Sequence, residues 1–277
     1  MAVIIPCYSD GEHIEETVAS IREDEPVEIV LVDDASPDER TRSVLARFEA
    51  DGVATVVRHA ENRGVGAARN TGVRATSAPY VFTLDSDDVA VPGVLAHLAD
   101  LLDRNEEAAV AYGDYAEFGE IELVRAVPQW IDPYRLAYTN EYPPTAMFRR
   151  GVLEAIGGWE EHRCENAYYE DWHLWLDLAE RGERGMHPGP GFVTYRQRVH
   201  GPRLLEAAKK NHVSHYRRLR GTHEPLFARI REHRRRSDLS PLRRRLYPLV
   251  YGGRPRFRFE RKVKDALDRA GVWTMRR

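Results

Sequence analysis

Three carboxylates lie within four residues at Asp85, Asp87 and Asp88, directly after the apolar run 80–84. Like charges held this close repel one another, so the cluster needs a positive partner. Carboxylate oxygens are ligands that hard divalent cations prefer, and such a cation would in turn hold phosphates. The cluster therefore predicts a cation site for a phosphate-bearing ligand. The alternative is a solvated turn after a strand, where Asp and Ser are common.

A second pair of acids, Asp33 and Asp34, ends the apolar run 28–32. Asp33 continues the predicted strand, and its carboxylate could accept a hydrogen bond from the N–H of a nucleobase. Asp34 is followed by Ser36 and Pro37, so a structural role as a helix or turn cap is the simpler interpretation for it.

Glu170 and Asp171 stand at the start of a predicted helix, 170–181, whose side chains are apolar on nearly every face. Such a helix should be buried. The helix dipole alone favours acids at this end, but a buried carboxylate there could also act as a general base. His200 follows the predicted strand 192–196 and is either a surface histidine or a metal ligand.

The segment 62–70 is rich in Gly and Ala and enters a predicted helix, 64–75. Its spacing is not G-x-G-x-x-G, and it does not follow the first strand, so it is only weakly similar to a phosphate-binding glycine turn. Its small residues favour close packing, and Arg69 could face a nucleotide pocket.

The first half of the chain alternates strand and helix patterns, which predicts an α/β fold with a mainly parallel sheet and helices on both faces. Ligands of such folds bind beyond the carboxyl ends of the strands, where Tyr8, Asp33 and Asp85 fall. Asp10 is expected to cap the first helix. The predicted elements are strands 3–6, 28–32, 55–58, 80–84 and 108–112, and helices 39–50, 64–75 and about 92–104.

Charge is distributed unevenly along the 277 residues. Residues 201–277 hold 23 of the 41 Lys and Arg but 7 of the 44 Asp and Glu, a net charge of +16. This basic, helical region indicates attraction to anionic lipid or a phosphorylated acceptor, and the acidic remainder of the chain argues against nucleic acid. Two cysteines and the lack of an apolar run long enough to span a bilayer predict a cytoplasmic protein without a disulfide scaffold or zinc site.

Taken together, these motifs resemble the family 2 glycosyltransferases of the GT-A (Rossmann-like) fold. The resemblance covers residues 1–201, and residues 202–277 form a basic, mainly helical extension that fits no family motif. The motifs occur in the family's order: Val3-Ile4-Ile5-Pro6-Cys7-Tyr8, Ile29-Val30-Leu31-Val32-Asp33-Asp34, Asn62 through Asn70, Leu84-Asp85-Ser86-Asp87-Asp88, Gly157-Gly158-Trp159, Glu170-Asp171-Trp172, and Tyr195-Arg196 with His200.

The resemblance implies a role for each matching residue. Nucleotide contacts fall to Pro6, Tyr8, Asp33, Asn62 and Arg69, with Asp85 at the ribose or sugar and Arg196 near the diphosphate. Asp87, the last acid of the D-x-D motif, would ligate Mg²⁺ or Mn²⁺ together with His200. Asp171 would be the catalytic base and Glu170 an acceptor or sugar contact. Cys7 and His173 depart from the family pattern without removing a required role.

These implications predict an inverting, metal-dependent glycosyltransferase. It would move a sugar from a nucleotide-diphosphate sugar, preferably a UDP-sugar, to a hydroxyl of a glycan or lipid-linked acceptor. The basic region would dock on the inner face of the cell membrane. The alternatives are a retaining GT-A transferase, a nucleotidyltransferase, or a sugar-nucleotide-binding module without catalysis, and the sequence leaves the oligomeric state open.

Overall fold

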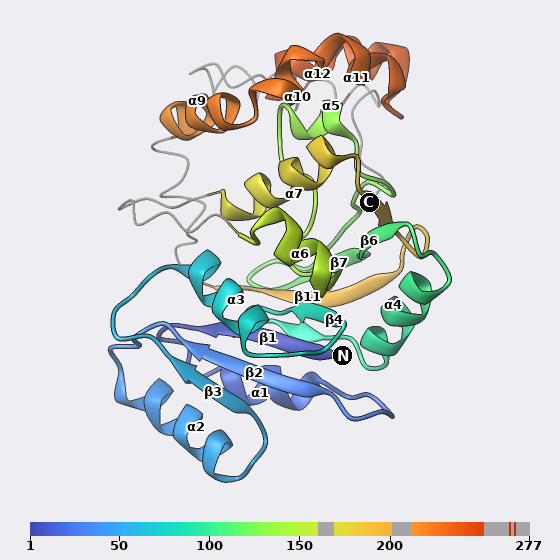
Figure 1. Ribbon diagram of the computed structural model, residues 1–277. Coiled ribbons are helices and arrows are strands. Elements are labelled where there is room, and N and C mark those ends of the chain that lie inside the picture. The colour runs from blue at the N-terminus through green and yellow to red at the C-terminus, as the bar shows by residue number, and fades with distance from the viewer. Residues whose placement is uncertain (160–168, 201–211, 252–265, 267–268, 270–277) are drawn as a thin grey trace.

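The computed structural model describes residues 1–159, 169–200, 212–251, 266 and 269. Its centre is a seven-stranded sheet in the order β10-β6-β9-β4-β1-β2-β3 (Figure 1). β1 to β4 pair in parallel, as do β6 and β10, whereas β9 runs antiparallel to β4 and β6. The predicted α/β, mainly parallel sheet is confirmed, and β9 is an antiparallel addition to it. The strands are β1 Ala2–Cys7, β2 Glu28–Asp33, β3 Thr55–Arg58, β4 Tyr80–Thr83, β6 Ala108–Ala111, β9 Met147–Arg149 and β10 Arg184–Met186.

A second, four-stranded sheet has the order β5-β11-β7-β8. β5 begins directly after Asp88 and pairs antiparallel with β11, so that Arg196 lies opposite Val89. This pairing brings the end of β11, and with it His200, next to the loop that carries Asp85, Asp87 and Asp88, here called the acidic loop. The two segments are more than a hundred residues apart in sequence. The strands are β5 Val89–Ala90, β7 Asp114–Gly119, β8 Leu123–Arg125 and β11 Val193–Val199.

Helices cover both faces of the large sheet (Figure 1), and a separate hydrophobic core lies under each layer. Because side chains alternate along a strand, Ile4 of β1 joins the core that includes Trp175, while Val3 and Ile5 join the core that includes Leu95. The helices are α1 Ile14–Ser20, α2 Glu39–Ala50, α3 Val65–Arg74, α4 Val94–Asp103, α5 Pro133–Leu136, α6 Arg150–Ile156 and α7 Glu170–Arg181.

The small residues of α3 serve close packing, as predicted. A Cβ added at Gly72 would lie 2.2 Å from the Cγ2 atom of Ile4 on β1, a separation that real atoms do not tolerate. α7 is buried, also as predicted, with Trp172 and Trp175 each at most 4% exposed. The first turn of α7 is thereby held against the sheet layer, and this turn carries Glu170 and Asp171.

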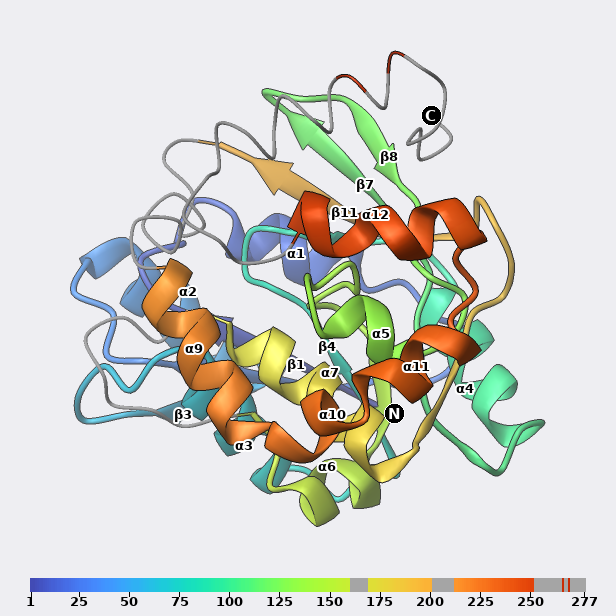
Figure 2. The same ribbon diagram turned by 90° about the horizontal axis from the view of Figure 1, so that it is seen from above.

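Within residues 212–251, four helices lie across α5 and α7, at the end of the molecule remote from β3 (Figures 1 and 2). Tyr216, Leu219 and Leu226 belong to the same hydrophobic core as α7. The predicted boundary between residues 201 and 202 lies outside the described residues. None of the helices in the described ranges is long and apolar enough to cross a membrane. The four are α9 His212–Thr222, α10 Glu224–Ala228, α11 Ile230–Arg236 and α12 Pro241–Tyr251.

Candidate active site

The predicted nucleobase residues lie at the ends of β1 and β2 and on the loop before α3. Pro6 is buried in β1, and Tyr8, just beyond that strand, is 46% exposed. Asp33 is 5% exposed, and its Oδ1 atom accepts a hydrogen bond from the N–H of Ser36 at 2.9 Å. Asn62 is exposed on its loop. Cys7 pairs with Asp33 in the sheet, so the exposed Tyr8 and the buried Asp33 lie at the same edge of the sheet, where a flat polar ligand could bind.

Asp34 is structural, which was the simpler of its two interpretations. Its Oδ1 atom lies 2.6 Å from Nδ1 of His59 and accepts from the N–H of Arg63 at 2.8 Å. Its Oδ2 atom accepts from the N–H of Gly64 at 2.7 Å. Asp34 thus fixes the loop that enters α3, and the glycine provides the left-handed backbone at its N-cap, with φ of 88°.

The expectation that Asp10 caps the first helix is wrong for its side chain. The residue at the N-cap of α1 is His13, and the Asp10 carboxylate instead accepts from the hydroxyl of Ser86 at 2.6 Å and from the N–H of Tyr8 at 3.2 Å. Thr17 donates to the carbonyl of Ser86 at 2.8 Å. The Asp10 carboxylate thus holds the acidic loop beside the end of β1, and Thr17 holds the same loop to α1.

The acids of the loop have different surroundings. Asp88 is 1% exposed and accepts from the N–H of Arg198 at 2.8 Å, so it fastens the loop to β11. Asp87 is partly exposed, and its Oδ2 atom lies 2.9 Å from Nε2 of His200. The structure therefore brings the two predicted metal ligands together, at the surface.

Arg69 is the centre of a buried ion-pair network. Its guanidinium is 2% exposed and donates to Oδ1 of Asp85 at 2.7 Å and to Oε1 of Glu170 at 3.2 Å. Burial lowers the pKa of Arg69, but the two carboxylates more than offset this effect, so the net pKa shift is upward and the group stays charged. Arg69 lies where the acidic loop meets the first turn of α7, and it joins Asp85 and Glu170 from different parts of the chain.

Glu170 and Asp171 are adjacent, but their partners differ. Whereas Glu170 pairs with Arg69, Asp171 accepts from the side-chain amide of Asn140 at 2.9 Å and from the N–H of Trp172 at 2.8 Å. Burial and then the charge of Asp171 raise the pKa of Glu170 to about 7. Burial also raises the pKa of Asp171, against the opposing effect of Arg69. A carboxylate whose pKa is raised toward neutrality is a stronger base than a solvated one.

β11 carries two arginines, Arg196 and Arg198, on one face. Only Arg196 was identified from the sequence. The guanidinium of Arg196 lies over the ring of Phe118, 4.4 Å from its centroid, and that of Arg198 lies over the same ring at 4.5 Å. Among the described contacts, it is Arg198 that donates to the carbonyl of Asp87, at 3.0 Å. The two-residue spacing of Arg196 and Arg198, which places both on one face of a strand, was the signal that could have included Arg198.

Comparison with known proteins decides the family. Residues 2–157 match the family described as "Glycosyl transferase family 2". The chain belongs to this family. The succinoglycan biosynthesis protein ExoU of Rhizobium meliloti (strain 1021) is 32% identical to this family 2 member over 180 residues, which cover 61% of this chain and 50% of ExoU. The chain spans 64% and 50% of the length of the first two curated relatives it matches, and 34% of the third.

Solved structures share the fold of this family 2 member. S. aureus TarS (residues 1–349), in complex with UDP-GlcNAc, is similar with a TM-score of 0.61 at 18% identity, covering 99% of this chain and 83% of that one. The mannosyltransferase PcManGT from Pyrobaculum calidifontis, in complex with GDP-Man and Mn²⁺, gives 0.57 at 20% identity, covering 98% and 75%. The similarity confirms the expected fold, a central sheet flanked by helices.

Proposed function

We propose that this family 2 member is an inverting glycosyltransferase that moves a sugar from a nucleotide-diphosphate sugar to an acceptor hydroxyl. One observation carries the proposal: a half-buried carboxylate pair, Glu170 and Asp171, stands beside the acidic loop and is coupled to it through Arg69. A base and a donor-binding loop held at a fixed separation are what a single displacement at a sugar carbon needs.

In this mechanism Asp171 removes the proton from the acceptor hydroxyl. The acceptor oxygen forms a bond to the anomeric carbon while the bond from that carbon to the diphosphate oxygen breaks. Attack from the face opposite the diphosphate inverts the anomeric configuration. Asn140 and the N–H of Trp172 hold the Asp171 carboxylate, and Arg69 holds Glu170 and Asp85 in place around the sugar.

The side chains of Asp87 and His200 fit a divalent cation, Mg²⁺ or Mn²⁺. A carboxylate oxygen and an imidazole nitrogen 2.9 Å apart at the protein surface supply donor atoms that such ions accept. A cation bound there would offset the negative charge that develops on the departing diphosphate. The presence of Mn²⁺ together with GDP-Man in the PcManGT complex supports a metal-dependent donor complex.

UDP-sugars are the favoured donors in this proposal. Asp33 is a buried acceptor at the same edge of the sheet as the exposed Tyr8, as recognition of a uracil N–H requires. The TarS complexes with UDP and with UDP-GlcNAc support this choice. The name of ExoU, which refers to succinoglycan biosynthesis, supports a glycan or lipid-linked acceptor and a place in cell-surface polysaccharide or glycoconjugate synthesis.

Asp87→Ala should weaken UDP binding only when metal is present. With Mn²⁺, UDP is expected to raise the melting temperature of the wild-type chain, since a ligand that binds the native state stabilises it, and the variant should lose most of this increase. With chelator, both chains should respond equally weakly in the same thermal-shift assay. An equal loss under both conditions would argue that Asp87 contacts the nucleotide directly rather than a metal.

The rate of transfer should fall on the acidic side of neutrality. A base acts only when it is unprotonated, and burial raises the pKa of Asp171 above its usual value. Initial rates at saturating donor should decline up to about tenfold per pH unit on the acidic side. In Glu170→Gln, which removes the neighbouring negative charge, the declining limb should move to lower pH. A rate that is constant from pH 5 to 8 would exclude this assignment.

The C-terminal helices are proposed to dock on an anionic membrane surface at the cytoplasmic side. On α12, Leu242, Arg245 and Leu249 follow helical spacing along one face, and the two leucines are 52% and 60% exposed. Leu242→Ser with Leu249→Ser should lower binding to phosphatidylserine-containing vesicles about tenfold in a sedimentation assay. Val124→Ser, which alters an exposed apolar residue on β8, should change nothing. Equal binding by all three chains would remove α12 from the docking surface.

A further inference from the structure

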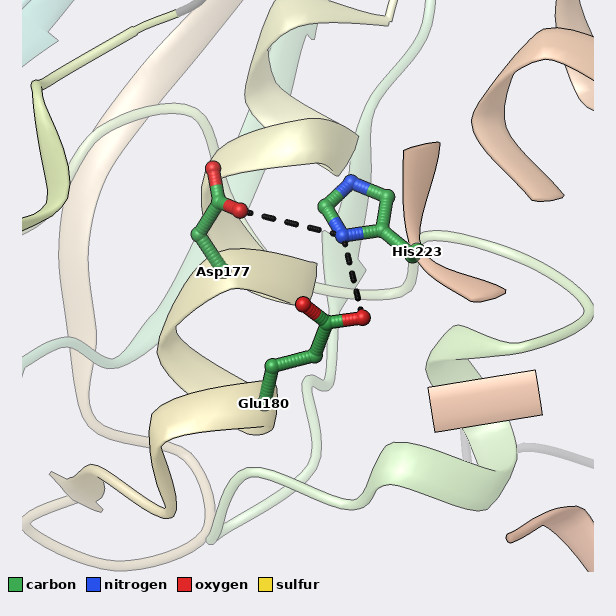
Figure 3. Close-up of side chains that lie close together, drawn as sticks. All are labelled: Asp177, Glu180 and His223. Atoms are coloured by element: carbon green, nitrogen blue, oxygen red, sulfur yellow. Dashed lines mark ion pairs between the residues drawn. The ribbon is translucent and has the colours of Figure 1, made fainter. Parts of the chain in front are cut away.

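A second group of metal-ligating side chains lies on α7, away from Glu170 and Asp171. Asp177 and Glu180 are three residues apart, so they share a face of the helix. His223, which precedes α10, projects toward both carboxylates (Figure 3). With a rise of 1.5 Å per residue, these acids stand about 9–14 Å along the helix axis from Asp171. They therefore belong to a different site from the one described above.

The distances within this group fit a shared cation better than direct hydrogen bonds. Nδ1 of His223 lies 3.4 Å from Oε1 of Glu180 and 3.7 Å from Oδ1 of Asp177. Both exceed the usual range for an N–H···O bond, about 2.7–3.2 Å. Ligands at about 2.0–2.1 Å from a tetrahedral Zn²⁺ are about 3.3–3.4 Å apart. One atom from each of the three side chains lies within 4.8 Å of the others.

The histidine of this group has the support that a metal ligand needs. His223 is 1% exposed, and its other ring nitrogen, Nε2, lies 2.9 Å from Nδ1 of His173. A ligating imidazole commonly donates its second N–H to a hydrogen-bond acceptor, which directs the opposite lone pair at the ion. In the tautomer with the proton on Nε2 of His223, that acceptor is Nδ1 of His173. His173, one turn before Asp177 on α7, is itself 5% exposed. The contact with His173 therefore orients Nδ1 of His223 toward the carboxylates of Asp177 and Glu180.

An ion could enter this site from solvent. The side chains of Asp177 and Glu180 are 37% and 23% exposed. A cavity of about 300 Å³ borders Asp177 and is also lined by His173 and Thr222. It has room for a water molecule, which would complete a coordination shell of three protein ligands.

We propose that Asp177, Glu180 and His223 bind a Zn²⁺ ion that fastens the C-terminal helices to α7. The two carboxylates come from α7 and the imidazole from the turn between α9 and α10, so one ion bridges both parts of the chain. Its ligands are a histidine and two carboxylates, a kind of site that cysteine content does not reveal. Because α7 carries Glu170 and Asp171 at its other end, the ion would hold the helix that positions them.

The test is a Zn²⁺ titration of the metal-stripped, full-length chain by calorimetry, without nucleotide. We expect one Zn²⁺ per chain, and binding weaker by about tenfold or more in Glu180→Gln and in Asp177→Asn. Glu183→Gln, which alters a nearby acid outside the group, should bind like the wild type, and Asp87→Ala, which alters the proposed donor-site ligand, should keep the Zn²⁺ bound by Asp177, Glu180 and His223. Circular dichroism would check that each variant keeps its fold.

Co²⁺ in place of Zn²⁺ gives a readout independent of affinity. The wild-type chain and Asp87→Ala should show the intense visible absorption of tetrahedral Co²⁺, and folded Glu180→Gln should lose it. Zn²⁺ should also raise the melting temperature of the wild-type chain but not of Asp177→Asn. The proposal is overturned if the wild-type chain binds no Zn²⁺, or if Glu180→Gln and Asp177→Asn bind it as tightly as Glu183→Gln.

Discussion

Asp171→Asn is expected to lower the rate of sugar transfer by about 10³-fold or more while leaving UDP binding nearly unchanged. The amide keeps the shape of the side chain but takes no proton from the acceptor, and a general base contributes about 10²–10⁴ to a rate. The carboxylate lies in the first turn of α7 and is held by Asn140, not by the acidic loop. Transfer would be measured by release of UDP, and UDP affinity by calorimetry with Mn²⁺.

Asp100→Asn is a suitable control for this variant, since Asp100 lies on α4 and is 53% exposed in a pair with Arg104. Its rate should match that of the wild type. Full activity in Asp171→Asn would remove Asp171 as the base. A parallel loss of UDP affinity would instead assign it to donor binding.

Arg69→Met is expected to destabilise the chain by about 3–5 kcal/mol. Removal of one partner from a buried ion pair leaves the other charge uncompensated in a poorly solvated place. Here two carboxylates, Asp85 and Glu170, lose their common cation, and methionine fills only part of the space. Urea denaturation at pH 8, above the raised pKa of Glu170 of about 7, would measure the change in the free energy of unfolding.

The matched control is Arg104→Met, which breaks an exposed pair with Asp100. Exposed pairs contribute at most about 1 kcal/mol. The loss in Arg69→Met should also shrink as the pH falls below the raised pKa of Glu170, about 7, because a protonated Glu170 needs no cation. Equal effects of the two substitutions would show that the Arg69 network adds nothing to the stability of the chain.

Patterns of apolar residues predicted the bounds of several elements. The helix expected at 39–50 and that at 170–181 have the same bounds as α2 and α7, and the strand expected at 55–58 is β3. In α2 the buried residues Thr41, Val44 and Leu45 follow the helical period, so the local pattern and the burial agree there. By contrast, β9 is three residues long, and its antiparallel pairing depends on neighbours far away in sequence.

The motif residues were found from sequence, but their partners were not. The sequence singled out Arg69 for a nucleotide pocket, and the structure shows that its guanidinium joins Asp85 to Glu170. Asn140 lies in an irregular segment with no periodic signal, yet it contacts Asp171. Such contacts depend on tertiary packing, which a pattern along the chain does not encode.

His223 illustrates the same limit at the other end of α7. In the sequence it lies among arginines of a basic, helical region, and nothing beside it suggests a ligand. Its relation to Asp177 and Glu180 arises when α10 packs on α7, because Leu226 joins the core beneath that helix. The spacing of the two acids on one helix face was visible from sequence, but their third partner was not.

The central claim is that Asp171 drives a single displacement on a nucleotide-diphosphate sugar. The most direct test is the anomeric configuration of the product, followed by NMR from the first turnovers with an α-linked UDP-sugar. We predict that the product forms with the β configuration, and that Asp171→Asn gives no product above background. A product with the α configuration would contradict a single displacement and would indicate a retaining transferase.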